Sequence, residues 1–312
     1  SDGTKVAPEF LRWLVRSPAW WEQVQRFLNV GAVFDSLKCR EIPSFRLPIP
    51  PLDQQLLITE VLGSIDEKID LNRRMNQTLE DMAQALFRSW FVDFDPVRAK
   101  AEGLQPEGMD EETAAMFPNR LVESDLGNTP EGWAIRRMGD ILELKRGYDL
   151  PSAQRVPGDV PVVSSSGPSG WHNEAKVPGP GIVTGRYGSI GEVFLVREDF
   201  WPLNTTLYVR DLKGNNLMYV YHLLRLLDFN KFSDKAAVPG INRNHLHEEL
   251  LVAAPRTLQE RFSDLAGLLL DLVAKNTAQV TTLAVLRDTL LPKLLSGEIR
   301  VGEAEAQVAA SA

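Results

Sequence analysis

The sequence predicts an α+β protein in which two long helices pair as an antiparallel coiled coil and carry a globular α/β domain. Three observations support this fold class. Residues 50–91 and 255–295 repeat one helical pattern, so that at an offset of 204 Asn72 aligns with Asn276 and Leu86 with Leu290. Both stretches place apolar residues at heptad spacing. The residues between them carry short β-like runs separated by Gly and Pro.

The first long helix is predicted over residues 50–95. Forty residues at a rise of about 1.5 Å each give a rod of roughly 60 Å. Pro96 disfavours helical backbone at Asp95, so the helix should end there. The carboxylates Asp93 and Asp95 are interpreted as part of this helix end. The predicted core positions are Ile58, Val61, Ile65, Asn72, Met75, Leu79, Met82 and Leu86.

The second long helix is predicted over residues 256–297, with Gly297 as its stop. Residues 298–312 have no clear packing face and are expected to form a mobile tail. The core positions of this helix are Phe262, Leu265, Leu269, Leu272, Asn276, Leu283, Leu286 and Leu290.

Asn72 and Asn276 occupy core positions of their heptads. One buried Asn in a helical seam fixes the alignment of the helices at some cost in stability. We therefore predict that this pair sets the helix register. The alternative is that one or both side chains turn to the edge of the seam and contact water.

The residues between the helices divide into a linker and a domain. Residues 96–129 are acidic and turn-rich, with one short helix predicted at 110–116. Residues 130–255 form the domain, in which runs at 159–165, 181–185, 192–196 and 205–209 predict strands and 217–227 predicts a helix.

The repeat extends upstream of the first helix. FLRWLVRS (10–17) is similar to YVYHLLRL (219–226), so residues 1–49 match the last third of the domain at 130–255. This first copy lacks the counterpart of roughly eighty residues. The absence of an initiator Met suggests that the chain starts within a longer protein.

Composition limits the class of protein. The single cysteine, Cys39, excludes an internal disulfide framework and favours a cytoplasmic location. No apolar run is long enough to cross a bilayer. The net charge of −8 is carried mainly by the first helix and the linker, whereas residues 130–255 are neutral and hold all four histidines. A locally basic face in that domain is compatible with this distribution.

The order of partial domain, long helix, full domain and long helix is accompanied by FVDFDPVRAKAEG (91–103), TPEGW (129–133), GIVTGRYGSIGEV (181–193) and LLSGEI (294–299). Together these features resemble the specificity (S) subunit of type I restriction–modification systems. The resemblance implies that residues 1–49 are the C-terminal remnant of a first target-recognition domain and 130–255 a second one. Each such domain reads half of a bipartite target in double-stranded DNA, and the helices set the gap.

The resemblance also implies partners. Two methyltransferase (modification) subunits would dock on the helices, and restriction (motor) subunits would join that complex. With one complete reading domain, the chain would read one half-site, unless two chains pair as a homodimer. The methyltransferase would bind S-adenosylmethionine, because this chain lacks the [ND]PP[YF] and FxGxG motifs and needs no cofactor.

The predicted DNA contacts lie on four loops of the 130–255 domain. Arg suits guanine or phosphate, Asn suits adenine, and small polar groups beside an aromatic ring suit groove contacts. For GRYGSIG the alternative is a tight hairpin without a DNA role, and for the other loops it is ordinary solvated loop structure. The candidates are Lys145, Arg146, Tyr148, Arg155, Ser165, Trp171, His172, Lys176, Arg186, Tyr187, Lys231, Lys235, Asn242, Arg243, Asn244 and His245.

Catalysis and metal binding have little support in the sequence. No Walker loop is present, and no Cys pair accompanies His245 and His247, so a zinc site is not predicted. The chain is therefore predicted to be a non-catalytic DNA-specificity subunit. Two alternatives stay open: a coiled-coil scaffold without DNA readout, and part of a fused restriction–modification enzyme whose catalytic parts lie upstream.

Overall fold

The computed structural model describes residues 5–29, 35–232 and 240–311. The chain forms two compact units. The first comprises the residues up to Glu80 and from Asp271 onward, and the second comprises Asp81–Leu270. Each long helix contributes one part to each unit. Among the described residues, no helix is long and apolar enough to span a membrane.

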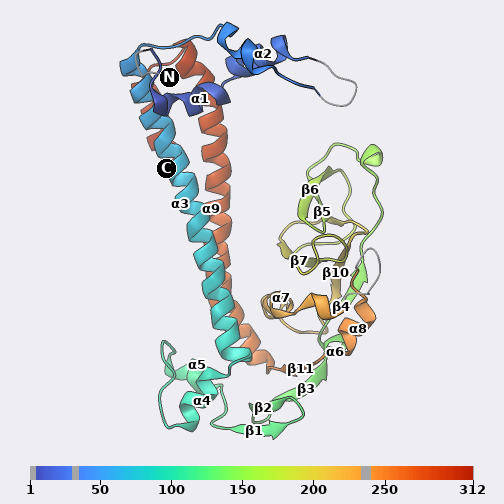
Figure 1. The fold of residues 1–312 in the computed structure, drawn as a ribbon. Coiled ribbons are helices and arrows are strands. Elements are labelled where there is room, and N and C mark those ends of the chain that lie inside the picture. Colours follow the sequence, from blue (N-terminus) through green and yellow to red (C-terminus); the bar gives the residue numbers. More distant parts are fainter. Residues whose placement is uncertain (1–4, 30–34, 233–239, 312) are drawn as a thin grey trace. The chain divides into compact units, whose positions relative to one another are not determined.

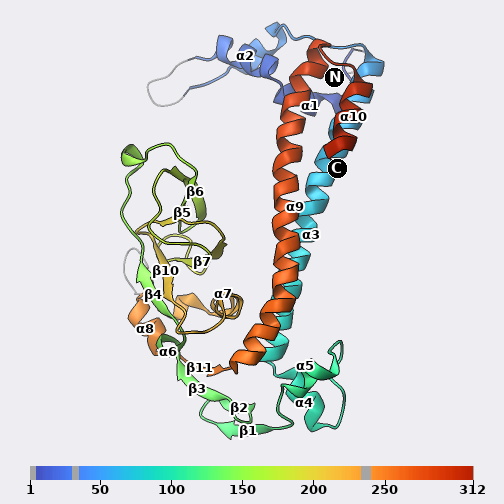
Figure 2. The same ribbon diagram turned by 180° about the vertical axis from the view of Figure 1, so that it is seen from behind.

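The two predicted long helices are α3 (Leu52–Phe91) and α9 (Arg256–Ser296), seen side by side in Figures 1 and 2. Within the first unit Asp66 pairs with Arg287, and Asn72 contacts Gln279. Residue numbers rise on one helix as they fall on the other, so the pairing is antiparallel, as predicted. Gly297 has a φ of 74°, the left-handed conformation of a helix stop, which confirms its predicted role.

The seam of the coiled coil differs from the prediction. Met75 and Met82 were assigned to the core, but they are 43% and 53% exposed, and Leu272 is 46% exposed. The buried positions Leu62, Ile69 and Ala83 lie one residue after the predicted heptad positions. Between residues 58 and 69, apolar residues occur both at the predicted heptad positions and one residue after them. The apolar pattern alone therefore could not decide which set of positions faces the seam. The assignment of Met75, Met82 and Leu272 was therefore wrong.

The first unit packs the N-terminal segment against the helical pair. A 3₁₀ turn, η1 (Pro8–Phe10), leads into α1 (Leu11–Arg16) and α2 (Pro18–Phe27), and a second turn, η2 (Cys39–Ser44), follows. Pro18 begins α2, and Ser17 caps this helix by accepting from the N–H of Trp20. The core of this unit comprises Ala7, Phe10, Trp13, Leu14, Ile58, Val61, Leu62, Ile65, Ile69, Leu283, Leu290, Leu291, Leu294, Leu295 and Ala304.

The segment after α9 is helical. Helix α10 (Val301–Ser311) buries Ala304 completely, and Val301 and Val308 pack against the same core. Residues 298–312 were expected to be a mobile tail. The spacing of Val301, Ala304 and Val308 gives the segment a narrow apolar stripe, which the small side chains made hard to recognise.

The linker at 96–129 is also structured, within the second unit. It forms α4 (Asp95–Ala101), α5 (Glu111–Ala115), β1 (Leu121–Ser124) and β2 (Gly127–Pro130). Lys100 donates to the carbonyl of Ala114 at 2.8 Å, and Arg261 pairs with Asp110 at 2.8 Å. The first contact joins α4 to α5 within the linker, and the second fastens the linker to α9.

The globular part of the second unit contains the predicted strands. An antiparallel sheet has the order β4-β10-β7-β8, formed by β4 (Glu143–Arg146), β10 (Thr206–Asp211), β7 (Gly181–Gly185) and β8 (Val193–Val196). A second sheet has the order β6-β5-β9, formed by β6 (Gly167–His172), β5 (Val160–Ser164) and β9 (Trp201–Pro202). The chain enters and leaves this domain through the pair β3 (Ala134–Arg137) and β11 (Leu250–Ala253).

Three helices complete the domain: α6 (Met138–Ile141), α7 (Leu217–Leu226) and α8 (Arg243–Glu248). Two 3₁₀ turns, η3 (Ser152–Gln154) and η4 (Phe229–Phe232), lie in the loops. Helix α7 contacts β7 and β8 on one face. On the other face Tyr219 and His222 pack against rings of the long helices, including Phe87 and Phe262. Helix α7 therefore joins the sheet to the helical pair.

Candidate nucleic-acid interface

Three arginines from distant parts of the sequence meet at one pocket of about 330 Å³. Arg146 ends β4, Arg186 follows β7, and Arg243 begins α8. Asn242 and Asn244 also line the pocket, and Leu207 and Ile241 supply apolar lining. The sheet and α8 thus bring together five of the residues that the sequence analysis selected, from three of its four loops.

Backbone contacts fix the position of Arg186. Its N–H donates to the carbonyl of Thr205 at 2.9 Å, and its own carbonyl accepts from the N–H of Ile241 at 3.0 Å. Its guanidinium lies over the Tyr187 ring, 4.4 Å from the centroid. Tyr187 in turn forms a β-bridge to Gly240, where a Cβ atom would lie 2.2 Å from the tyrosine ring. Only glycine permits this approach.

The glycines of GRYGSIG form a tight hairpin between β7 and β8, which pair antiparallel. A Cβ at Gly185 would lie 1.9 Å from the carbonyl oxygen of Ser189. The hairpin and the binding interpretation of this motif are therefore compatible, because the turn is what presents Arg186 to the pocket.

The start of α8 orders the other side of the pocket. The Asn242 side chain caps the helix by accepting from the N–H of Asn244 at 3.1 Å, so its oxygen has a structural task. Arg243 donates to the carbonyl of Leu144 at 3.4 Å. Asn244 and His245 are exposed at the same helix start.

Within the described residues, no carboxylate neutralises the charge of the pocket. Among the described residues, Arg146, Arg186 and Arg243 form no ion pair, whereas the nearby Arg210 and Arg137 pair with Glu143 and Glu248. Three cations that are held together without a carboxylate favour an anionic ligand.

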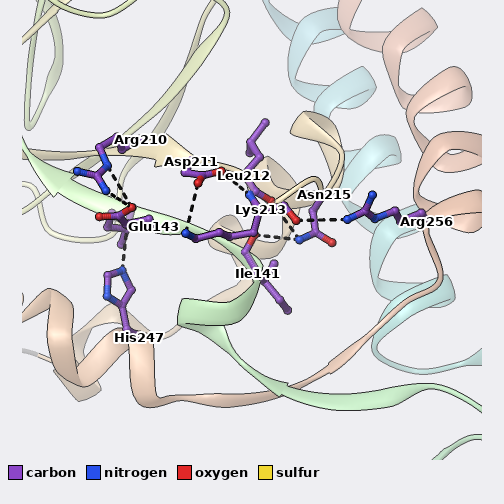
Figure 3. A network of polar contacts seen from close by, with 10 residues as sticks. Ile141, Glu143, Arg210, Asp211, Leu212, Lys213, Asn215, His247 and Arg256 are labelled. Atoms are coloured by element: carbon purple, nitrogen blue, oxygen red, sulfur yellow. Dashed lines mark hydrogen bonds and ion pairs between the residues drawn. The ribbon is translucent and has the colours of Figure 1, made fainter.

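A polar network lies beside the pocket (Figure 3). Burial, followed by the charge of Arg243, lowers the pKa of His247. The neutral ring accepts from the N–H of Leu144 at 3.0 Å through Nε2. Farther along, Asn215 donates to the carbonyl of Ile141 at 2.9 Å, and Arg256 donates to that of Lys213 at 3.4 Å. This network is structural and joins the first strand of the sheet to α8 and to the start of α9.

The remaining candidates on strand β4 and its loop are partly engaged. The Tyr148 hydroxyl lies 3.0 Å from that of Tyr208, and Lys145 lies over the Tyr148 ring. This hydrogen bond, with help from Lys145, lowers the pKa of Tyr148. Arg155 donates to the carbonyl of Ser169 at 2.9 Å, which ties its loop to β6.

The loop around β6 separates into buried and exposed residues. His172 is only 5% exposed, packs on Trp201, and accepts at Nδ1 from the N–H of Val156 at 3.0 Å. This burial argues against the DNA contact predicted for His172. Its neighbour Trp171 is 61% exposed, since alternate residues of a strand face opposite sides. Ser165 is half-buried, and Lys176 pairs with Glu174 at 2.6 Å.

The other described positions of the prediction do not line the pocket. Lys231 is exposed in η4, and Lys235 lies outside the described residues. Leu207 and Ile241 were missed, because a residue type typical of a core carries no sign of a binding role. In the described part of the chain, no group of three or more His, Cys, Asp or Glu residues could hold a metal ion.

In the helical seam, the two asparagines have different environments. Asn72 is 3% exposed and donates through Nδ2 to Oε1 of Gln279 at 2.8 Å. The Nδ2 atom of Asn276 is buried without a hydrogen-bond partner in the described structure. The register role of the two asparagines stays a prediction, and of the two side chains it is Asn72 that contacts the other helix through a hydrogen bond in the described structure.

The chain thus combines a mixed α/β domain that has an arginine-lined pocket with two paired long helices. Residues 130–249 match the family model described as the type I restriction modification DNA specificity domain. The chain is similar to specificity subunits of type I restriction–modification systems.

Two curated relatives align with nearly the whole length of this chain. The MjaIX specificity subunit of Methanocaldococcus jannaschii is 27% identical over 323 residues, which span 96% of this chain and 70% of the relative. The HindI specificity subunit of Haemophilus influenzae is 25% identical, over 94% of this chain and 78% of the relative. The crystal structure of an S subunit from M. genitalium has a similar fold, with a TM-score of 0.57 at 18% identity, over 94% of this chain and 74% of that one.

Proposed function

We propose that this chain is the non-catalytic DNA-reading subunit of a type I restriction–modification complex, and that its 130–255 domain reads one half of a bipartite target. The observation that carries the proposal is the pocket of Arg146, Arg186 and Arg243, which lacks a carboxylate partner among the described residues. Duplex DNA offers phosphates to such a cluster, and guanine offers O6 and N7.

The pocket and its surroundings suggest that different residues contact the phosphates and the bases of DNA. Arg186 is held by backbone contacts and by the Tyr187 ring, which suits a contact of fixed position such as a phosphate. Asn244, His245 and Trp171 are exposed and are better placed to approach base edges. Phosphate contacts would set the register of the domain on DNA, and base contacts would select the sequence.

Selection from a randomised duplex pool, performed with the modification subunit present, tests the proposal. Enrichment of one short motif is expected. Arg186→Ala should weaken binding to all sequences about equally, and it should lower the slope of log K against log salt by about 0.9 if one phosphate contact is lost. The control is Arg137→Ala, because Arg137 is already paired with Glu248.

Other outcomes have definite meanings. Two half-sites at fixed spacing would indicate pairing of two chains or a functional first copy. No enrichment from a complex that still forms would reject DNA readout and favour the scaffold alternative. Equal slopes of log K against log salt for Arg186→Ala and the wild-type chain would show that Arg186 makes no phosphate contact.

The long helices are proposed to dock two methyltransferase subunits, which would carry S-adenosylmethionine, and restriction subunits would join them. This proposal is supported by large apolar side chains that the helices expose: Leu268 is 66% exposed, Val285 62% and Leu56 55%. Replacement of Leu268 by Asp should weaken co-purification with the modification subunit. The matched control is Asp264→Asn, at an exposed polar position of the same helix. Asp substitutions at Val285 and Leu56 test the other exposed positions, and unchanged co-purification of all three Asp variants would contradict docking on these faces.

A further inference from the structure

The two copies of the repeat contain equivalent buried glutamines. Gln55 and Gln259, separated by the same offset as the helices, are 0% and 1% exposed. Each lies in the first turns of its long helix and donates its backbone N–H to the carbonyl of a proline, Pro51 or Pro255. Buried amides of this kind are costly unless every donor and acceptor is satisfied.

The glutamine side chains make matching contacts. Gln259 accepts at Oε1 from the N–H of Asn216, the N-cap of α7, at 3.0 Å. Gln55 accepts from the N–H of Ala7, the N-cap of η1, at 2.8 Å. Ala7 and Asn216 are equivalent in the upstream repeat, so each glutamine binds the start of the same domain helix.

The donors match as well. Nε2 of Gln259 donates to the carbonyl of Ala254 at 2.9 Å and to Oδ1 of Asn215 at 3.0 Å. Nε2 of Gln55 donates to the carbonyls of Pro50 at 2.7 Å and Lys5 at 2.9 Å. Each side chain therefore joins three segments: the domain helix, the chain just before the long helix, and the long helix itself.

The apolar core cannot supply this alignment alone. In the second unit the domain packs on α9 through Leu258, Phe262 and Ala266, and such burial is not directional. Hydrogen bonds have narrow angular limits, so a fully bonded amide at the junction selects one orientation among several packings of similar burial.

We infer that Gln55 and Gln259 are paired positioning residues, each of which fixes the angle of a recognition domain on its long helix. The functional part of this inference rests on the proposed function, because the angle matters only if the domain presents DNA to a methyltransferase. The contact is present in both copies of the repeat, as expected of a contact that belongs to the junction.

The first test uses the chain alone. Spin labels at Ser166→Cys in the recognition domain and Asp264→Cys on α9, both exposed and both in the second unit, are placed in a Cys39→Ser background. Gln259→Met keeps the length of the side chain and removes its hydrogen bonds. We expect a broader or shifted distance distribution with helix content unchanged by circular dichroism. Glu260→Met, at the exposed neighbouring position, is the control and should match the parent.

If Gln259→Met does not fold, Gln259→Glu keeps the acceptor for Asn216 and removes both donors, and it should broaden the distribution in the same way. A distribution as narrow as that of the parent, and with the same mean, in a folded Gln259 variant would overturn the inference. This result is independent of DNA, so it is separate from any failure of the proposed function.

The second test uses the complex with the modification subunit and the selected DNA. Gln259→Met should leave the enriched sequence and the DNA affinity unchanged while it lowers the methylation rate by roughly 10- to 100-fold, because the reacting groups are misplaced. A merely structural role would instead lower the amount of folded complex and keep the rate per complex. An unchanged rate per complex would therefore overturn the functional part of the inference.

Discussion

The two asparagines of the helical seam should respond oppositely to the same substitution. Asn72 is almost fully buried and donates to Gln279 at 2.8 Å. Replacement by Leu removes that donor and leaves the Oε1 atom of the half-buried Gln279 with one partner fewer, which costs about 1–3 kcal/mol. Burial of the added apolar surface recovers part of this, so Asn72→Leu should destabilise the chain by about 1 kcal/mol.

At Asn276 the same substitution should have the opposite effect on stability. Its Nδ2 atom is buried without a partner among the described residues, so the wild-type chain already bears a desolvation cost. Asn276→Leu removes this cost and adds apolar burial, which should stabilise the chain by about 1 kcal/mol. The double variant Asn72→Leu/Gln279→Leu removes donor and acceptor of this hydrogen bond together, so it should cost less than the sum of the two single substitutions.

Urea unfolding followed by circular dichroism measures these differences, provided that the m-values agree. Disulfide formation between Asn76→Cys and Thr277→Cys, whose native side chains lie 3.0 Å apart, reports the helix alignment. Equal effects of Asn72→Leu and Asn276→Leu on stability would refute the reasoning. An Asn72→Leu/Asn276→Leu variant that cross-links as fast as the parent would show that neither residue sets the register.

Three further predictions concern the second unit. Phe262→Ala removes a fully buried ring of α9 that packs against α3 and α7. It should lower the free energy of unfolding in urea by about 3–5 kcal/mol. Hydrogen bonds from Thr113, followed by one from Arg261, lower the pKa of Asp110 to about 2. The ionised carboxylate should therefore stabilise the linker above the pKa of the unfolded chain, and this stabilisation should be lost as the pH falls towards 2. An NMR titration that gives an ordinary Asp pKa would contradict this prediction. Gly240→Ala places a Cβ against the neighbouring tyrosine ring and should weaken DNA binding without loss of helix content, as checked by a binding titration beside circular dichroism.

Long-period features of this fold were predictable from the sequence, since both long helices repeat one pattern over about forty residues. Strands flanked by Gly and Pro were located to within a residue or two, as with 181–185 and β7. The phase of the seam was not predictable, because Val61 and Leu62 are both apolar and both buried, and the choice between phases is made only near Met75 and Asn76.

The candidate site was predictable by residue type and less so by position. The sequence identifies basic and amide side chains on loops, and three arginines do meet at the pocket. Burial depends on strand alternation, so the sequence could not separate the exposed Trp171 from the buried His172. Gln55 and Gln259 were visible in the repeat, but their contacts cross between elements that no local pattern connects.

The junction between β7 and β8 has a consequence for how such a domain can diversify. The chain around Arg186 is held by main-chain hydrogen bonds and by glycines that tolerate no side chain, and neither depends on which residues stand at the exposed positions nearby. Substitutions at Asn244, His245 or Trp171 would thus alter the chemistry offered to a ligand while the frame around them persists. Inheritable changes of target would then require few mutations and little loss of folding stability.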